Sequence, residues 1–308
     1  MQWAGQFAYP PAMTSLDGVE AMLDGAPREF LNSTEWSEAV GAPLAGDASA
    51  RKYFRLRRAG QTAVLMDSSQ MLESVAPFLR IDQHLVRLGF SAPAILARDD
   101  AHGFLLLEDF GDDTFARLLA NHGEAERLYA LATDVLVALH QQAQAIPPGL
   151  RAYHPEKMLE DIDLFLDWST PAISEEGKAA YRKAWLEVLP LARQVPTSLL
   201  LRDYHVANLM LLPGREGVRQ AGLLDFQDAY QGPITYDLMS LLEDARRDVP
   251  ESLKAKMLAR YLASFADLDR EAFATSLAIL AALRHTRVLA VFDRLGQRDG
   301  KHDYKKLH

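Results

Sequence analysis

The spacing of hydrophobic positions changes character about a third of the way along the chain. Residues 41–108 alternate between short apolar runs and turn-forming stretches, which predicts strands, one helix and further strands. After Gly111, most apolar positions recur at helical spacing. We therefore expect an α+β protein with a small, sheet-rich part over residues 1–110 and a larger, mostly helical part over residues 111–308.

The sheet-rich part is expected to contain two strand pairs around one helix. The strands are short runs of apolar or alternating residues: Tyr53–Arg57, Ala63–Met66, Ala94–Ala97 and Phe104–Leu107. Ala59-Gly60 is typical of a turn within the first pair, and Asp99–Gly103 of a turn within the second. Between the pairs, Glu73–Leu88 has helical spacing, and Gly89 is a natural end for that helix. Residues 13–40 are expected to hold one or two short helices.

The helical part is expected to contain three short strands among its helices. Two sets of apolar positions each fall on one helical face: Leu128, Leu131, Ala132, Val135, Leu136 and Leu139, and then Tyr181, Ala184, Trp185, Val188, Leu189 and Ala192. Apolar runs at Leu199–Leu201, Leu209–Leu212 and Gly222–Phe226 interrupt this spacing and predict the strands. Further helices are expected from Tyr236 onward.

Composition and charge narrow the class of protein. The chain has no cysteine, which excludes disulfides and thiolate chemistry. Its formal net charge of -9 makes it a poor candidate for nucleic-acid binding, and the acidity suits solubility or a cationic substrate. No apolar run reaches about 18 residues, and Met1–Met13 lacks the pattern of a signal peptide. We therefore expect a cytoplasmic protein with no membrane or nucleic-acid partner.

Three polar side chains stand at the ends of the short strands in the helical part. Asp203 follows the first strand, Asn208 begins the second five positions later, and Asp225 ends the third, just before Phe226. Phosphoryl transfer from ATP needs one carboxylate to orient an acceptor hydroxyl and take its proton. It also needs oxygen ligands, such as an amide and a second carboxylate, to hold Mg²⁺ against the phosphates. The pattern therefore indicates phosphoryl transfer.

The segment Asp203-x-x-x-x-Asn208, followed by Leu224-Asp225-Phe226, resembles the catalytic and metal-binding loops of the aminoglycoside phosphotransferase family. The resemblance implies a two-lobed, protein-kinase-like fold and an ATP-dependent small-molecule kinase that uses Mg²⁺. It also implies that Asp203 is the catalytic base and that Asn208 and Asp225 are Mg²⁺ ligands. Asp228 and Asp237 match further family positions, and Asp237 would brace the catalytic loop through backbone hydrogen bonds.

The sheet-rich part resembles the family's nucleotide-binding lobe. Leu105–Gly111 is similar to the hinge of the family, where backbone groups of Glu108 to Phe110 would meet the adenine edge. Gly46 and Ser49 belong to a small, turn-rich stretch between strands, which suits either a phosphate-covering loop or a plain turn.

One position departs from the usual family pattern, because Met66 stands where most members have a lysine that pairs with ATP phosphates. Either Mg²⁺ would then offset more of the phosphate charge, or another cation would do so; Arg51, Lys52 and Arg55 on the preceding strand are candidates. Strand alternation places Arg51 and Arg55 on one face and Lys52 on the other. The sequence leaves open which face looks toward the nucleotide.

The motifs, read with their flanking residues, resemble those of one branch of this family, the bacterial anomeric kinases of cell-wall amino sugars. They include Arg51–Leu56, Asp203-Tyr204-His205 and Leu241–Arg246, and in this branch a methionine at the lysine position is expected. The resemblance implies that the acceptor is the 1-hydroxyl of N-acetylmuramate or N-acetylglucosamine. Candidate acceptor-binding residues are Asp163, Arg284 and Arg287, with Asp161 and Trp168 also considered; an arginine would suit the lactyl carboxylate.

Two alternatives remain at this point. The first is a kinase for another acceptor, such as an aminoglycoside or a choline-like alcohol; acidic residues around Asp203 would favour an aminoglycoside. Arginine, asparagine or aromatic residues there would favour an acetylated sugar acid. The second is a pseudokinase that binds nucleotide without turnover; the missing lysine suggests it, and the presence of Asp203, Asn208 and Asp225 together argues against it.

Overall fold

The computed structural model describes residues 23–44, 50–121 and 124–298, so the predicted loop residues Gly46 and Ser49 lie outside the described residues. The chain divides into two compact units. The first contains the residues up to Val135 together with Val206–Asp228, and the second contains Leu136–His205 together with the residues from Ala229 onward. The predicted division after residue 110 concerns the two lobes implied by the resemblance and stays a prediction.

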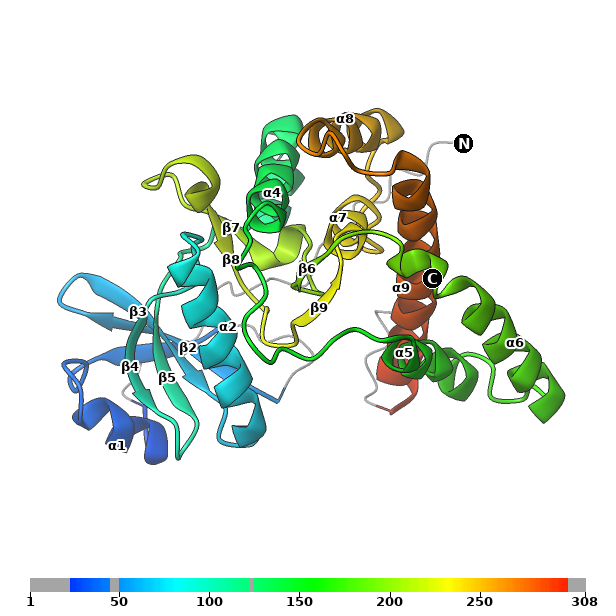
Figure 1. Ribbon diagram of the computed structural model, residues 1–308. Helices are drawn as coiled ribbons and strands as arrows, with labels where there is room; N and C mark the ends of the chain where they lie inside the picture. The colour runs from blue at the N-terminus through cyan, green and yellow to red at the C-terminus, as the bar shows by residue number, and fades with distance from the viewer. Residues whose placement is uncertain (1–22, 45–49, 122–123, 299–308) are drawn as a thin grey trace. The chain divides into compact units, whose positions relative to one another are not determined.

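A five-stranded antiparallel sheet dominates the first unit, with strand order β1-β2-β3-β5-β4 (Figure 1). Its strands are β1 (Val40–Pro43), β2 (Lys52–Arg58), β3 (Gln61–Asp67), β4 (Ile95–Asp99) and β5 (Phe104–Glu108). Ala59 and Gly60 join β2 to β3 with φ values of 46° and 80°, as a tight two-residue hairpin turn requires. The four predicted strands are confirmed, and β1 is an additional one.

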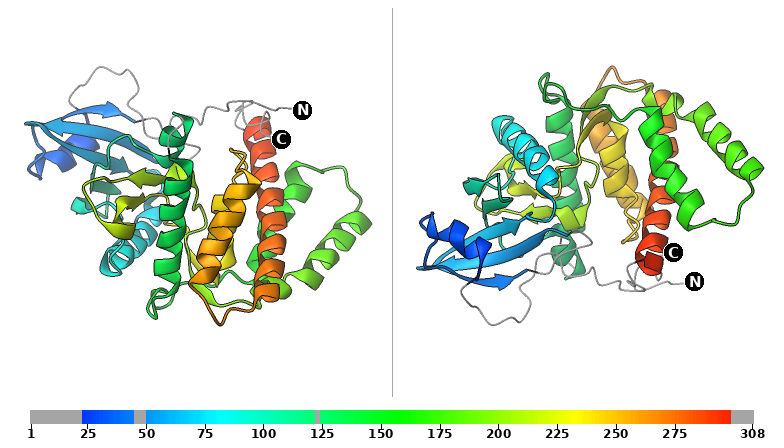
Figure 2. Two further views of the ribbon diagram at one scale, coloured as in Figure 1. Left: turned by 90° about the horizontal axis from the view of Figure 1, so that it is seen from above. Right: turned by 90° about the horizontal axis from the view of Figure 1, so that it is seen from below.

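Helices also belong to the first unit: α1 (Ala26–Asn32), the 3-10 turn η1 (Leu72–Ser74), α2 (Val75–Arg87), α3 (Phe115–Ala120) and the start of α4 (Ala125–His140). Among them, α1 packs on the sheet. Phe30 and Leu31 of α1 pack with Leu65 and Leu106 in one apolar cluster. Consecutive residues 63–67 of β3 are all buried, so the opposite face is covered as well. Figure 2 shows α2 running beside the sheet.

A short hairpin of the helical sequence region also belongs to the first unit. It consists of η3 (Val206–Asn208), β7 (Leu209–Leu211), η4 (Gly217–Gln220) and β8 (Ala221–Leu223). Isolated bridges link Met210 to Thr114 and Gly222 to Ser91. A side chain at Gly222 would lie 2.8 Å from the ring of Phe110, so the close approach of these two segments requires glycine.

The second unit is mostly helical around a two-stranded sheet. Its elements are α5 (Pro155–Trp168), α6 (Glu175–Val188), η2 (Leu191–Arg193), β6 (Thr197–Leu200), β9 (Tyr230–Pro233), α7 (Thr235–Leu242), α8 (Glu251–Ala263) and α9 (Arg270–Arg298). Its core includes Tyr153, Met158, Tyr236, Leu280 and Leu283. Strand β9 was not predicted, because the sequence Gln-Gly-Pro within it has the residues of a turn.

Helix α9 is long and apolar enough to cross a membrane by length and composition, with a mean hydropathy of 1.3 over its most apolar window. Its contacts favour a different role. Phe273, Leu280 and Leu283 are buried in the core of the second unit, and α9 packs against α5 and α7. The buried Arg284 donates a hydrogen bond to the backbone of Arg202. We interpret α9 as a core helix of its unit.

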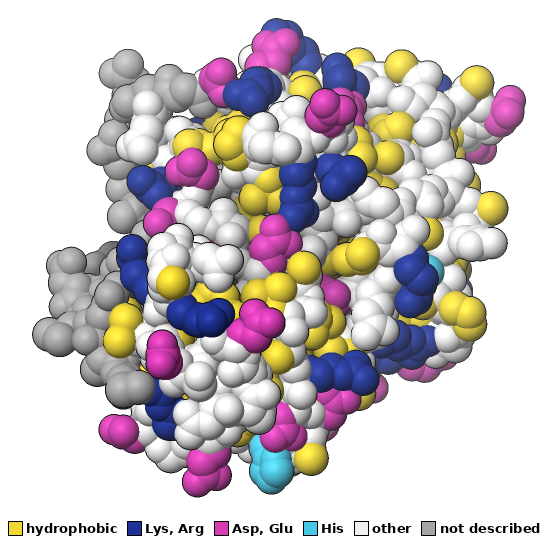
Figure 3. Space-filling view, turned by 90° about the vertical axis from the view of Figure 1, so that its left-hand side faces the viewer, with side chains coloured by type: hydrophobic (Ala, Val, Ile, Leu, Met, Phe, Trp, Pro, Cys, Tyr) yellow, Lys and Arg dark blue, Asp and Glu magenta, His cyan; other side chains and the backbone are white. Residues whose placement is uncertain are grey.

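Charged side chains of both signs are mixed on one face of the molecule. On the face drawn in Figure 3, lysine and arginine side chains alternate with aspartate and glutamate, and no large area carries one sign of charge. A mixed surface of this kind suits solubility better than binding to a polyanion.

Candidate functional site

Asp203 follows β6 in the second unit, after a strained backbone turn. Arg202 has a φ of 75°, and the amide of Asp203 donates to the carbonyl oxygen of Leu201 at 3.0 Å, which closes a three-residue turn centred on Arg202. A left-handed arginine is unfavourable and persists only where its surroundings hold it. The sequence did not predict this turn, because nothing about Arg202 favours a positive φ.

Asp237, in the first turn of α7, holds that backbone in place. Its carboxylate accepts hydrogen bonds from the amides of Leu201 at 2.6 Å and Arg202 at 2.8 Å. Arg284 donates to the carbonyl oxygen of Arg202 at 3.2 Å. Burial raises the pKa of Asp237 to about 7, although the two donated hydrogen bonds and Arg284 act in the opposite direction. These are the backbone hydrogen bonds that the family resemblance implies for Asp237.

The carboxylate of Asp203 lies among guanidinium groups. One oxygen is 3.7 Å from a guanidinium nitrogen of Arg284, and 25% of the side chain is exposed. Burial by itself would raise the pKa of Asp203, but the charges of Arg287 and Arg284 outweigh burial and hold the pKa below its ordinary value. Asp203 is therefore ionised at neutral pH and able to accept a proton from an acceptor.

A buried carboxylate two turns into α5 organises these arginines. Asp161 accepts from the hydroxyl of Tyr153 at 2.8 Å and from Arg202 at 2.7 Å; Lys157 lies 3.0 Å away and Arg287 3.9 Å away. Burial acts to raise the pKa of Asp161, and its positive neighbours, Arg202 first, bring it below the ordinary value. This dense pairing makes Asp161 a positioning residue for Arg202 and Arg287.

Of the predicted acceptor residues, the structure brings Arg284 and Arg287 toward Asp203, whereas Asp163 lies against α6. Its carboxylate pairs with Arg182 at 2.9 Å. Residues two apart on a helix point to different faces, which separates Asp163 from Asp161. The helical phase contained the signal, because Asp161 shares the buried face of Met158 and Ile162.

Asn208 and Asp225 lie together in the first unit. The side-chain amide nitrogen of Asn208 is 3.4 Å from one oxygen of Asp225, and Gln227 donates to the other oxygen at 2.7 Å. Asp225 has a φ of 59° and a side chain that is 48% exposed, while the next residue, Phe226, is buried against Phe78 with ring centroids 5.1 Å apart. The left-handed turn thus directs the carboxylate outward while its neighbour is anchored.

These residue types suit Mg²⁺. An exposed carboxylate and a neighbouring amide offer oxygen ligands of the kind that Mg²⁺ prefers, and Mg²⁺ usually takes only one or two protein carboxylates together with nucleotide phosphates. Among the described residues, no group of three or more His, Cys, Asp or Glu side chains is arranged to hold a metal. A Mg²⁺ site formed by Asn208 and Asp225 together with nucleotide phosphates stays a prediction.

The structure distinguishes the three candidate cations on β2 and just before it. Arg51 is buried and has a guanidinium nitrogen 3.9 Å from Asp225. Arg55 is also buried, but it is engaged with Asp109 at 2.9 Å and Asp112 at 2.7 Å. Lys52 is exposed. Of these three, Arg51 is the cation placed next to the candidate metal ligands.

One backbone hydrogen bond and two side-chain contacts hold the predicted hinge in place. The amide of Glu108 donates to the carbonyl oxygen of Ala94 at 2.8 Å, and the carboxylate of Glu108 pairs with Arg215. The same arginine lies over the ring of Phe110, 5.3 Å from its centroid. Contacts of Glu108 and Phe110 with a nucleotide stay a prediction, as does a supporting role for Asp228, which is exposed.

An antiparallel sheet with α2, followed by a helical region whose loops carry Asp203, Asn208 and Asp225, defines the protein-kinase-like class of phosphotransferases. Solved structures agree. The chain resembles a Plasmodium vivax ethanolamine kinase with a TM-score of 0.63 at 12% identity, covering 91% of this chain and 82% of that one. It resembles an aminoglycoside 2'-phosphotransferase-IIIa, solved with GDP, with a TM-score of 0.63 at 15% identity, covering 91% and 95%. The predicted fold class is thereby confirmed.

The chain belongs to the phosphotransferase enzyme family, whose sequence profile matches residues 40–274. It is 34% identical to an N-acetylmuramate/N-acetylglucosamine kinase of Caulobacter vibrioides over 91% of this chain and 88% of that protein. It is also 34% identical to a protein of the same name from Pseudomonas aeruginosa, over 93% and 86% of the two chains. The predicted family is confirmed, and the chain is an ATP-dependent phosphotransferase.

Proposed function

We propose that this protein transfers the γ-phosphoryl group of ATP to the 1-hydroxyl of N-acetylmuramate and N-acetylglucosamine. The observation that carries the proposal is the ionised Asp203, fixed by Asp237 and surrounded by Arg284 and Arg287. The sequence relatives of that name support the choice of acceptor, because each spans most of the chain. A role in recycling cell-wall sugars in the cytoplasm would follow.

In the proposed reaction, Asp203 accepts the proton of the 1-hydroxyl as the sugar oxygen forms a bond to the γ-phosphorus and ADP leaves. An anomeric hydroxyl is more acidic than an ordinary alcohol, so a carboxylate of low pKa is a sufficient base. Asn208 and Asp225 would hold Mg²⁺, which neutralises phosphate charge when bound. Arg51 would add the positive charge that a strand lysine supplies elsewhere in the family.

The rival acceptors fit the charges less well. An aminoglycoside is polycationic, and the guanidinium groups of Arg202, Arg284 and Arg287 near Asp203 would repel it. A pseudokinase would not need an ionised Asp203 whose surroundings are held by two buried carboxylates, Asp237 and Asp161. The arginine residues around Asp203 are thus of the kind expected from the sequence for an acetylated sugar acid.

The test measures ADP release with Mg-ATP on a panel containing both amino sugars, kanamycin and choline. We expect turnover on the two amino sugars, with loss of reducing-end reactivity in step with ADP release, because a 1-phosphate blocks the anomeric carbon. ADP release with the reducing end intact would place the phosphate on another hydroxyl. Binding of ATP without turnover on any acceptor would favour the pseudokinase.

A further inference from the structure

The loop after α7 places one arginine beside the segment that follows Asp203, within the second unit. A guanidinium nitrogen of Arg246 lies 3.3 Å from Nε2 of His205. Asp244 accepts from the amide of Arg246 at 3.0 Å, and its carboxylate is 3.9 Å from the guanidinium group. The side chain of Arg246 keeps 24% of its surface exposed. The guanidinium group is thus held by His205 and Asp244, while part of the side chain stays exposed.

Of the two partners of Arg246, His205 orients the guanidinium group without adding a negative charge, whereas Asp244 pairs with it at 3.9 Å. Burial, and then the charge of Arg246 itself, lower the pKa of His205 to about 4, so the imidazole is neutral at physiological pH. Nε2 therefore accepts from Arg246, and the ring proton is on Nδ1. Arg284 differs, because it is almost fully buried and lies between the carboxylate of Asp203 and the carbonyl of Arg202.

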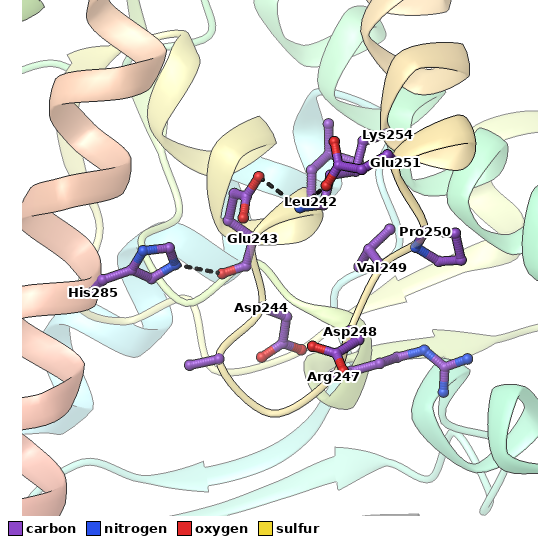
Figure 4. A pocket seen from close by; sticks show the side chains of 11 residues that line it. Leu242, Glu243, Asp244, Arg247, Asp248, Val249, Pro250, Glu251, Lys254 and His285 are labelled. Carbon is purple, nitrogen blue, oxygen red and sulfur yellow. Dashed lines mark hydrogen bonds and ion pairs between the residues drawn. The ribbon is translucent and has the colours of Figure 1, made fainter. Parts of the chain in front are cut away.

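A cavity of about 520 Å³ opens on the same loop. Figure 4 shows Asp244, Arg247 and Asp248 on one side of it, with Lys254 and His285 on others. The two neighbours of Arg246 in sequence, Ala245 and Arg247, both line this cavity. Its volume is in the range of small-molecule sites, roughly 300–1,000 Å³. Arg246 itself is not among the residues that line the cavity, which also include Glu243 and Glu251.

We propose that Arg246 binds the carboxylate of the lactyl ether of N-acetylmuramate and so sets the preference between the two acceptors. This inference rests on the proposed function. The lactyl group is attached to a different ring carbon from the reacting 1-hydroxyl, so its receptor must be displaced from the base. Arg284 lies 3.7 Å from Asp203, whereas Arg246 contacts His205, two positions further along the chain, and offers a planar fork suited to a carboxylate.

The two acceptors provide the test, because N-acetylglucosamine lacks the lactyl ether. We expect Arg246→Gln to lower kcat/KM for N-acetylmuramate by roughly 10- to 100-fold, mainly through KM, and to change kcat/KM for N-acetylglucosamine less than about threefold. Arg246→Lys, which keeps the charge and loses the fork, should fall between. Arg182→Gln removes an exposed arginine of α6 from the same unit and should change neither value.

Each outcome decides the inference. An equal loss on both sugars with Arg246→Gln would show that Arg246 supports the loop rather than reads the carboxylate, and an unchanged preference would exclude it as the receptor. Equal losses with the milder Arg246→Lys, in a protein that melts at the wild-type temperature, would also overturn it. If the wild-type protein phosphorylated neither sugar, the proposed function itself would fail, which is a separate result.

Discussion

The two sets of candidate residues, one in each unit, are built in opposite ways. In the second unit, the turn before Asp203 depends on buried side chains: Asp237 is 1% exposed and Asp161 is 3% exposed, and each accepts two or more hydrogen bonds. In the first unit, the side chain of Asp225 is 48% exposed, and Arg51 approaches it only to 3.9 Å. One part is tightly packed, and the other is open to solvent.

The difference corresponds to what each part would do. A catalytic base must have its position and its charge set before the acceptor arrives, which a buried network achieves. A Mg²⁺ ligand must keep oxygen lone pairs accessible, because the metal arrives with its nucleotide. We therefore expect substitutions in the packed part to lower stability as well as activity, and substitutions at Asp225 to lower activity alone.

The largest expected effect is that of Asp203→Asn. The amide keeps the shape of the side chain but cannot take the acceptor's proton, so kcat should fall by about 10²–10⁴-fold. Steady-state ADP release measures this, and circular dichroism checks that the variant is folded. Glu175→Gln, an exposed acidic residue of α6 that pairs with Lys178, is the matched control and should keep its activity. Near-full activity of Asp203→Asn would remove Asp203 as the base.

Asp225→Asn is the corresponding change in the open part. Asparagine tolerates the left-handed conformation at this position, so the variant isolates the charge, whereas Asp225→Ala would add backbone strain. Activity should fall at least about 100-fold, and the Mg²⁺ concentration needed for half-maximal rate should rise. The urea midpoint should stay the same. If Asp225→Asn lowered the urea midpoint as much as substitutions in the packed part are expected to, the proposed difference between the two parts would be wrong.

Much of the fold was predictable because it depends on local patterns. The hairpin at Ala59-Gly60, the helix that ends before Gly89 and the long apolar faces of the helices were all marked by spacing or by turn residues. Strand β1 was missed, because Val40–Pro43 is too short to show alternation. Strand β9 was missed because its Gly-Pro pair resembles a turn.

The site was predictable in part. Asp203, Asn208 and Asp225 were marked by their spacing, and their roles still await the experiments above. Asp161, rather than Asp163, organises the arginines, and choosing between them needs the helical phase of α5. Arg246 lies in the stretch Leu241–Arg246 that the family resemblance marked, but its contact with His205, 41 positions away in sequence, has no local signal. Contacts between such distant positions depend on how the elements pack.

Asp161→Asn tests the packed part through stability. Removing one partner of a buried charge network leaves Arg202 and Arg287 without full compensation, so the free energy of unfolding should fall by about 3–5 kcal/mol. Asp163→Asn, two positions further on the same helix, breaks a more exposed pair with Arg182 and should cost no more than about 1 kcal/mol. Urea unfolding of both variants provides the comparison. Equal losses of unfolding free energy would show that Asp161 contributes no more to stability than Asp163.

The smallest expected effect is a pH dependence of the second unit's stability. Burial lowers the pKa of His140 to about 3, where its Nδ1 lies 2.7 Å from the hydroxyl of Tyr261. Below about pH 6.5 the unfolded chain binds a proton at this position and the folded chain does not, so stability is lost as the pH falls, by about 1.4 kcal/mol per pH unit for each such group. His205, with a pKa of about 4, has the same sign. His140→Gln should therefore reduce the slope of the unfolding free energy against pH, between pH 6 and pH 5, by the equivalent of about one bound proton. The slope that remains should include His205, with the same sign, and Asp237, whose pKa of about 7 acts with the opposite sign. An unchanged slope in His140→Gln would show that His140 is protonated in the folded protein.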